Sequence, residues 1–116
     1  MPVNPKEHDA CKKSLLAVKD ALDVISSKWK LQIIIAIWAG NKRFKDIERQ
    51  IGGISPRMLS KELKDLEEHK LIVRKVYDTQ PVTIEYTATA HAETLKELVD
   101  KLRTWGIKHR KAVFGK

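Results

Sequence analysis

Two adjacent glycines, Gly52 and Gly53, separate two helical patterns in the middle of the chain. Before them, Phe44, Ile47 and Ile51 recur at the spacing of one helix face and predict a short amphipathic helix. Glycine adopts positive φ values that other residues avoid, so the pair predicts a tight turn. The chain is therefore expected to change direction between two helices that are close in sequence.

The segment after the glycines begins with strong signals for a second helix. Ser55 is a residue type that caps helices, and Pro56 suits the first helical position. The pattern predicts a helix over residues 56–69. Its apolar stripe consists of Leu59, Leu63 and Leu66. A short helix, a glycine turn and a capped second helix in succession form the helix-turn-helix arrangement.

The hydrophobic period changes after this helix. Residues 71–77 (LIVRKVY) and 82–87 (VTIEYT) are rich in β-branched and aromatic residues and have the length of strands. Asp78 and Pro81 lie between them and favour a turn. The sequence thus predicts a β-hairpin, or wing, in a mainly α fold, which is a winged helix-turn-helix.

Two longer helices are predicted toward the ends of the chain. Their apolar stripes consist of Leu15, Val18, Leu22 and Ile25 in the first helix, and of Leu95, Leu98, Val99 and Leu102 in the second. Gly106 is expected to end or bend the second helix, and the residues after it are basic without a clear structural pattern. Residues 1–10 contain Pro2 and Pro5 and are expected to form a flexible arm, so that residues 11–116 form the folded domain.

Residues 27–41 (SKWKLQIIIAIWAGN) are compatible with two structures. The β-branched isoleucines would suit a buried strand. The length of the segment, the serines before it and Gly40 near its end favour a buried helix. We therefore predict a helix.

Composition limits the classes of protein to be considered. The 116 residues suffice for one domain, and the formal net charge of +8 favours a polyanionic partner, although a basic protein can also be merely soluble. No apolar signal segment is present at the N-terminus, and the longest apolar stretch is too short to span a bilayer. A single cysteine excludes an intramolecular disulfide. We expect a cytoplasmic protein with no membrane partner.

Motifs for catalysis or metal binding are not recognisable. The four histidines lack metal-ligand spacing. No nucleophile–base pair, phosphate loop or paired carboxylate motif occurs. We therefore predict neither an enzyme, nor a metal site, nor a cofactor.

The predicted second helix carries cations opposite its leucines. Arg57, Lys61 and Lys64 recur at i, i+4 and i+7, and the helix dipole adds positive potential at the N-terminal end. Arg57 could pair with guanine and Ser55 or Ser60 could be weaker readers, whereas the lysines would bind phosphate. Alone, the pattern equally suits a solvated charged face. The helix-turn-helix and the hairpin around it favour DNA.

Further cations flank the motif. Lys42 and Arg43 precede the first helix of the motif and could hold backbone phosphate or be simple loop charges. Arg74 and Lys75 are neighbours on the first predicted strand, so their side chains point to opposite faces and at most one faces DNA. Of the two, Lys75 is assigned to the predicted DNA-binding set.

The blocks ALDVISSKWK, RFKDIE and GISPRMLSKELKDLEEHKLIVRKVYDTQPVTIEYT resemble the HxlR family of bacterial transcriptional regulators, winged helix-turn-helix proteins related to the MarR group. The resemblance covers about residues 11 to 105. It implies a homodimer on a pseudo-palindromic operator, with one recognition helix per half-site in the major groove and the wing (about residues 71–87) on the backbone or in the minor groove. It carries DNA contact onto Met58 and onto the wing around Thr79 and Thr83.

The sequence predicts one set of residues for DNA binding and another for the dimer interface. The predicted DNA-binding residues are Lys42, Arg43, Ser55, Arg57, Met58, Ser60, Lys61, Lys64, Lys75, Thr79 and Thr83. The predicted dimer-interface residues, implied by the resemblance, are Leu15, Val18, Leu22, Leu95, Leu98, Leu102 and Trp105. The leucine stripe near the C-terminus is equally compatible with the core of a monomer.

The chain departs from the family pattern in three places. Val82 and Thr83 occupy the part of the wing where relatives often have an arginine. Ala90 or Ala92 stands where a glycine usually follows the second strand, which affects the start of the last helix. Cys11 is followed by lysine rather than proline and lies further upstream than the cysteine of many relatives.

Two features have alternative roles. Cys11 is a candidate redox sensor because Lys12 and Lys13 would favour its thiolate, and it is otherwise an inert thiol packed in a dimer. The tryptophans could line a ligand pocket, although residues of this type more often belong to a core. They are Trp29, Trp38 and Trp105.

The resulting hypothesis is a sequence-specific transcriptional regulator. Its expected partners are double-stranded DNA, a second copy of the chain and an unidentified small-molecule or oxidant effector. The alternatives are a winged helix that pairs with protein and a nucleic-acid binder without sequence specificity.

Overall fold

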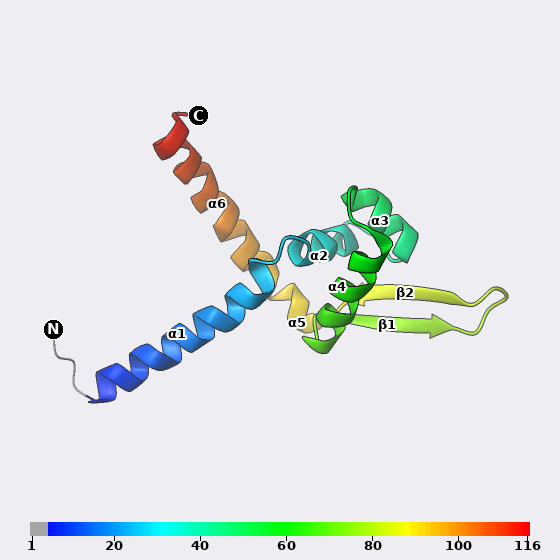
Figure 1. Ribbon diagram of the computed structural model, residues 1–116, viewed down its shortest axis with the longest axis horizontal. Helices are drawn as coiled ribbons and strands as arrows, with labels where there is room; N and C mark the ends of the chain where they lie inside the picture. The colour runs from blue at the N-terminus through cyan, green and yellow to red at the C-terminus, as the bar shows by residue number, and fades with distance from the viewer. Residues whose placement is uncertain (1–4) are drawn as a thin grey trace.

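The computed structural model describes residues 5–116 and confirms the predicted fold class. The elements are α1 (Pro5–Ile25), α2 (Lys30–Trp38), α3 (Phe44–Ile51), α4 (Pro56–Glu68), β1 (Ile72–Tyr77), β2 (Thr83–Ala88), α5 (Ala90–Glu93) and α6 (Leu95–Phe114). Helices α2, α3 and α4 and the β1–β2 hairpin pack into one unit, and α1 and α6 project from it in two different directions (Figure 1). We call this unit the winged-helix unit and the two projecting helices the arms.

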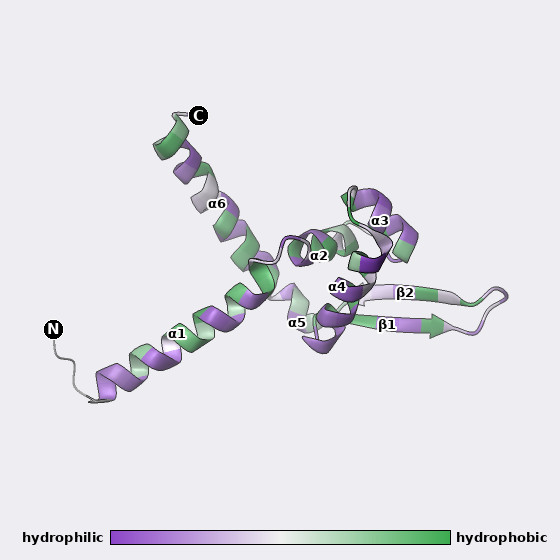
Figure 2. Ribbon diagram, viewed as in Figure 1, coloured by the Kyte–Doolittle hydropathy of each residue, from purple (hydrophilic) through white to green (hydrophobic). Residues whose placement is uncertain are grey.

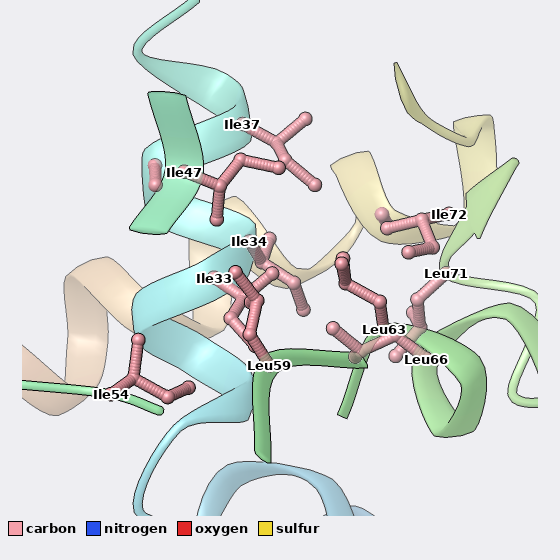
Figure 3. Close-up of a cluster of buried hydrophobic side chains, with 12 residues drawn as sticks. Ile33, Ile34, Ile37, Ile47, Ile54, Leu59, Leu63, Leu66, Leu71 and Ile72 are labelled. Atoms are coloured by element: carbon pink, nitrogen blue, oxygen red, sulfur yellow. The ribbon is translucent and has the colours of Figure 1, made fainter. Parts of the chain in front are cut away.

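The core of the winged-helix unit lies between α2, α3 and α4 (Figure 3). Helix α2 places Ile33, Ile34 and Ile37 in this core, which settles the ambiguity of residues 27–41 in favour of a helix. The predicted leucine stripe of α4 is confirmed. Leu59, Leu63 and Leu66 are at most 2% exposed. Burial of each such side chain stabilises the fold by about 1.5–3 kcal/mol, so the stripe fixes which side of α4 faces inward.

The ends of α2 follow the predicted signals in part. Ser27 Oγ accepts hydrogen bonds from the backbone N–H groups of Trp29 and Lys30, both at 3.4 Å. Gly40 lies just beyond the helix with a φ of 107°, a conformation that side chains disfavour. Ser27 therefore supports the turn that leads into α2 without being its N-cap, which is Trp29, and Gly40 allows the chain to leave the helix.

The hairpin is antiparallel, with Ile72 opposite Ala88 and Tyr77 opposite Thr83. Its open end is tied to the rest of the unit, because the Tyr86 N–H donates to the Lys42 carbonyl at 2.7 Å. The wing thus extends from a fixed base and projects beyond the helices (Figure 1).

Residues 5–10, expected to lie in a flexible arm, are helical in the structure. Helix α1 begins at Pro5, so the first helix starts earlier than the sequence indicated. Proline is tolerated in the first helical turn because its missing N–H would have no partner there. Residues 1–4 of the predicted arm lie outside the described residues.

The C-terminal helix is longer than the sequence indicated. Gly106 does not end α6, which continues through the basic segment to Phe114. The departure at Ala90 and Ala92 is accommodated by Thr89, whose hydroxyl accepts a hydrogen bond from the Ala92 N–H at 3.1 Å and caps the short α5. Among residues 5–116, no helix has the length and apolar character needed to cross a membrane.

The arms have almost no interior of their own. No residue of α6 is buried, and residues 6–25 of α1 are exposed or at most half-buried. Hydrophobic and hydrophilic residues alternate along both arms (Figure 2). An apolar surface that a single chain does not cover is therefore concentrated on these two helices.

Candidate nucleic-acid interface

The start of α4 is built by a turn and a cap. Gly52 and Gly53 both have positive φ values, 71° and 75°, as the predicted tight turn requires. Ser55 Oγ then accepts a hydrogen bond from the Met58 N–H at 3.1 Å, and Pro56 follows the cap. The first turn of α4 is therefore well fixed, and its positive dipole end faces solvent.

The outer face of α4 carries every polar residue that the sequence assigned to it. Arg57, Ser60, Lys61 and Lys64 are exposed, opposite the buried leucines. Met58 is 37% exposed and adds an apolar contact surface beside Arg57. One helix face thus presents cations, hydroxyl groups and a thioether, which can contact phosphates and base edges.

The wing adds a cation that the sequence analysis did not select. A hollow of about 350 Å³ between α4 and the hairpin is lined by Ser60, Leu63, Lys64, Glu67, Arg74 and Tyr86. Arg74 therefore lies on the α4 side of β1, and strand alternation directs its neighbour Lys75 to the other face. The sequence predicted that at most one of the two faces DNA and assigned Lys75, but it carried no signal for how the hairpin packs against α4.

The loop cations lie apart from this face. Lys42 lines a separate hollow of about 240 Å³, whose walls come from α2, β2, α5 and α6. Arg43 is exposed at the start of α3 with an extended backbone. Lys42 is thus not gathered with the α4 cations. The side chain of Arg43 is accessible and forms no ion pair within residues 5–116, while its carbonyl accepts from the Ile47 N–H at 3.0 Å.

The tip of the wing is uncharged between Thr79 and Thr83. The Thr79 hydroxyl donates to the Pro81 carbonyl at 2.7 Å and lies 3.0 Å from the Thr83 hydroxyl. These contacts shape the loop, and Val82 at the tip is 59% exposed. The tip can offer hydroxyl and apolar contacts to a partner but no cation.

A buried ion pair behind α4 escaped the sequence analysis. Lys30 Nζ lies 3.0 Å from a carboxylate oxygen of Glu62 and 3.6 Å from Asp65, and the Ser27 hydroxyl donates to Glu62 at 3.2 Å. Lys30 and Glu62 are 8% and 7% exposed. Buried charges are costly unless paired, so this network fixes α4 against the corner between α1 and α2. Its members are too far apart in sequence for helical spacing to reveal it.

The remaining candidates occupy different environments. Trp29 and Trp38 pack against the core, as the core interpretation predicted, whereas Trp105 is 64% exposed and stacks on His109. Cys11 is a free, exposed cysteine on α1. It lies four residues before Leu15, so it belongs to the same helix face as the apolar stripe of that arm.

A capped helix that follows a glycine turn, presents cations outward and lies beside a β-hairpin defines the class of winged helix-turn-helix DNA-binding proteins. Within that class, residues 24–113 match the model of the HxlR-like helix-turn-helix family, and the chain belongs to this family. The resemblance stated from the sequence is thereby confirmed.

Known relatives and structures agree with this assignment. The chain is 34% identical over 104 residues to the uncharacterized HTH-type transcriptional regulator YtcD of Bacillus subtilis, covering 90% of this chain and 82% of that protein. The reduced form of the transcriptional regulator YodB from B. subtilis superimposes with a TM-score of 0.76 at 26% identity, over 99% of both chains. The redox regulator HypR in its reduced form gives 0.76 at 33% identity, over 86% of this chain and 99% of HypR. The protein is an HTH-type transcriptional regulator that binds DNA, and not an enzyme.

Proposed function

We propose that the protein regulates transcription as a homodimer on a pseudo-palindromic operator, with α4 of each protomer in the major groove and the wing against the backbone. The observation that carries this proposal is the division of α4 into a buried leucine face and an exposed face with Arg57, Lys61 and Lys64. The capped N-terminal end of such a helix is the part that meets base edges in helix-turn-helix complexes.

The exposed residues have separable roles in this proposal. Arg57 is in the first turn and can donate two hydrogen bonds to a guanine, while Met58 can contact a thymine methyl group. Lys61 and Lys64 lie further along the helix and neutralise phosphates. Arg74 shares the hollow with Lys64, so it extends the phosphate contact onto the wing. Specificity then comes mainly from Arg57, and most of the affinity comes from the cations around it.

The dimer is proposed from the arms. Leu15, Val18 and Leu22 of α1 are 67%, 54% and 46% exposed. Leu102 and Trp105 of α6 are 41% and 64% exposed, and Leu95 and Leu98 are half-buried. Contiguous apolar surface of this kind marks an interface, and a second copy would cover it. The two copies of α4 would then lie about 34–36 Å apart, or a multiple of that distance, to reach successive major grooves.

Fluorescence anisotropy across a salt series tests the DNA-binding proposal. The probes are the intergenic DNA beside the protein's own gene and a random duplex of equal length. We expect the intergenic DNA to bind about a thousandfold more tightly at moderate salt. If both duplexes bound equally, the operator would be sought next by an unbiased selection of DNA sites. Failure of that selection to enrich any sequence would favour the alternative of a non-specific binder.

We also propose Cys11 as the point at which an oxidant acts. It is exposed, it has lysines on its C-terminal side, and it lies on the α1 face assigned to the dimer. The structural relative HypR is described as a redox regulator. Oxidation with diamide should change operator affinity in the wild type and leave Cys11→Ser unaffected. An identical response of both proteins would leave Cys11 as an inert thiol in the dimer.

A further inference from the structure

The positive charge of the protein is concentrated at the end of α6. Residues 101–116 contain six Lys or Arg and no Asp or Glu. Residues 26–89, which form the winged-helix unit, contain twelve Lys or Arg and eight Asp or Glu. The last sixteen residues thus carry a formal charge of +6, against +4 for the segment that reads DNA. The function proposed above gives this charge no role.

Most of this charge has no partner within the chain. Arg103 pairs with Asp100 at 2.8 Å, and Lys101 approaches Glu97 at 3.8 Å. By contrast, no carboxylate of residues 5–116 lies within ion-pair distance of the next three cations. These are Lys108, Arg110 and Lys111. The end of α6 is therefore an uncompensated positive surface.

A second face of α6 lies outside the stripe assigned to the proposed dimer. Arg103, Ile107, Arg110 and Phe114 recur at i, i+4, i+7 and i+11 and form one row. On a helical projection this row is more than a quarter turn from the stripe of Leu98, Leu102 and Trp105. Ile107 and Phe114 are 50% and 63% exposed, and the Arg110 guanidinium lies 5.4 Å from the centre of the Phe114 ring.

We propose that residues 101–116 form a second DNA-binding surface, which holds the phosphate backbone of a duplex segment other than the one read by α4. The unpaired cations Lys108, Arg110 and Lys111 are suited to a polyanion, because each phosphate neutralised releases counterions. An anionic membrane is less favoured, because this row offers only Ile107 and Phe114 for insertion, and the larger apolar stripe is assigned to the dimer. This last step rests on the dimer proposed above.

The position of α6 explains why a separate segment is needed. The arm projects from the side of the molecule opposite to the wing (Figure 1), and the longest extent of the chain is 65 Å. The end of α6 therefore lies away from α4 of the same protomer, on a different side of the molecule (Figure 1). A second surface at this end would let one dimer hold two stretches of duplex.

The test starts from a variant whose α4 is silenced by Arg57→Gln, Lys61→Gln and Lys64→Gln. Glutamine keeps helix propensity and removes the charge. A C-terminal variant adds Lys108→Gln, Arg110→Gln and Lys111→Gln. A matched control instead adds Lys6→Gln, Lys12→Gln and Lys13→Gln on α1, which removes the same charge elsewhere. Each protein is titrated with a random-sequence fluorescent duplex across a salt series.

We expect the α4-silenced protein to retain salt-dependent binding through α6. The C-terminal variant should bind at least about tenfold more weakly at low salt, and its salt slope should fall by about 2–3, since each phosphate contact contributes roughly 0.9. The control should stay within about twofold of the α4-silenced protein, because α1 makes no proposed DNA contact. Equal losses in the two variants would mean that only net charge matters and would overturn the proposal.

Two further measurements make the result specific. With α4 intact, immobilised duplex should capture a second labelled duplex through wild type and through the α1 control, but not through the C-terminal variant. Light scattering of the same variants should show an unchanged dimer. If the dimer of the C-terminal variant dissociated into monomers, the three cations would be assigned to contacts between the two protomers. The wild type could instead bind phosphatidylserine vesicles, while the three substitutions leave capture of the second duplex unchanged. That result would assign the three cations to a membrane. Either outcome would overturn the proposal, whereas the specificity of α4 is measured independently of it.

Discussion

At the scale of single residues, the least expected feature is the charge pair buried behind the recognition helix. Lys30 and Glu62 join α2 to the middle of α4, with Asp65 and Ser27 as further partners. A nonpolar contact could hold two helices together equally well. We expect the directional hydrogen bonds of these charges to favour the same rotation of α4 about its axis that burial of the leucine stripe requires.

Removal of one member should therefore be severe. We expect Lys30→Met to lower the free energy of unfolding by about 3–5 kcal/mol, because it leaves the Glu62 carboxylate buried without its cation. The double variant Lys30→Met/Glu62→Leu should recover most of the loss. Urea denaturation measures both. A single variant as stable as wild type would show that the pair is not buried in solution.

A second prediction at this scale distinguishes recognition of base edges from binding of the phosphate backbone. Arg57→Ala should cost about 1–3 kcal/mol on the operator and relax the preference at one position in each half-site. Lys64→Ala is the comparison, because it should weaken operator and random DNA alike and reduce the salt slope by about one. Binding to a panel of singly substituted operators measures both effects. Equal losses of Arg57→Ala on operator and random DNA would remove its reading role.

At the scale of elements, α4 depends on its cap. Ser55→Ala should destabilise the protein by about 1 kcal/mol, because the Met58 N–H loses its acceptor. Ser55→Asn keeps an acceptor at the same position and should stay close to wild type. Thermal unfolding of the two variants compares them, and an equal loss in both would indicate that the hydroxyl serves something other than the cap.

The elements differ in how far the sequence predicts them. The start of α4, its leucine stripe and the hairpin follow from local rules, since caps, helical spacing and strand length are properties of neighbouring residues. The continuation of α6 through Gly106 does not, because one glycine costs a helix only about 1 kcal/mol and neighbouring residues can offset this. The start of α1 at Pro5 was missed because a proline reads as a break, although it is well tolerated in a first turn.

The candidate site, too, was predictable only where neighbouring residues determine the structure. Exposure of Arg57, Lys61 and Lys64 follows from their spacing relative to the leucines. The place of Arg74 beside α4 depends on how the hairpin packs against the helix, and the pairing of Lys30 with Glu62 depends on how two helices cross. Both are tertiary relations between distant segments, which local patterns do not contain.

At the scale of the whole molecule, assembly should depend on the arms. If the proposed dimer forms through the arms, Val18→Glu should convert it to a monomer, because the substitution places a charge in the apolar stripe of α1. Lys13→Glu changes a residue on the other side of the same helix and should remain dimeric. Light scattering gives the masses, and a dimeric Val18→Glu protein would place the interface elsewhere. The monomer should also bind the operator more weakly, because the two half-sites of the operator would no longer be bound by one dimer.

The unburied arms have a consequence for the lifetime of the protein in the cell. Residues 6–25 and α6 contribute no fully buried side chain to a lone chain, so little energy opposes their local unfolding. A protease should therefore cut a chain without a partner in its arms first and leave the winged-helix unit as a resistant fragment. Pairing would shield the same backbone, and degradation would then remove unpaired copies while sparing those assembled on an operator.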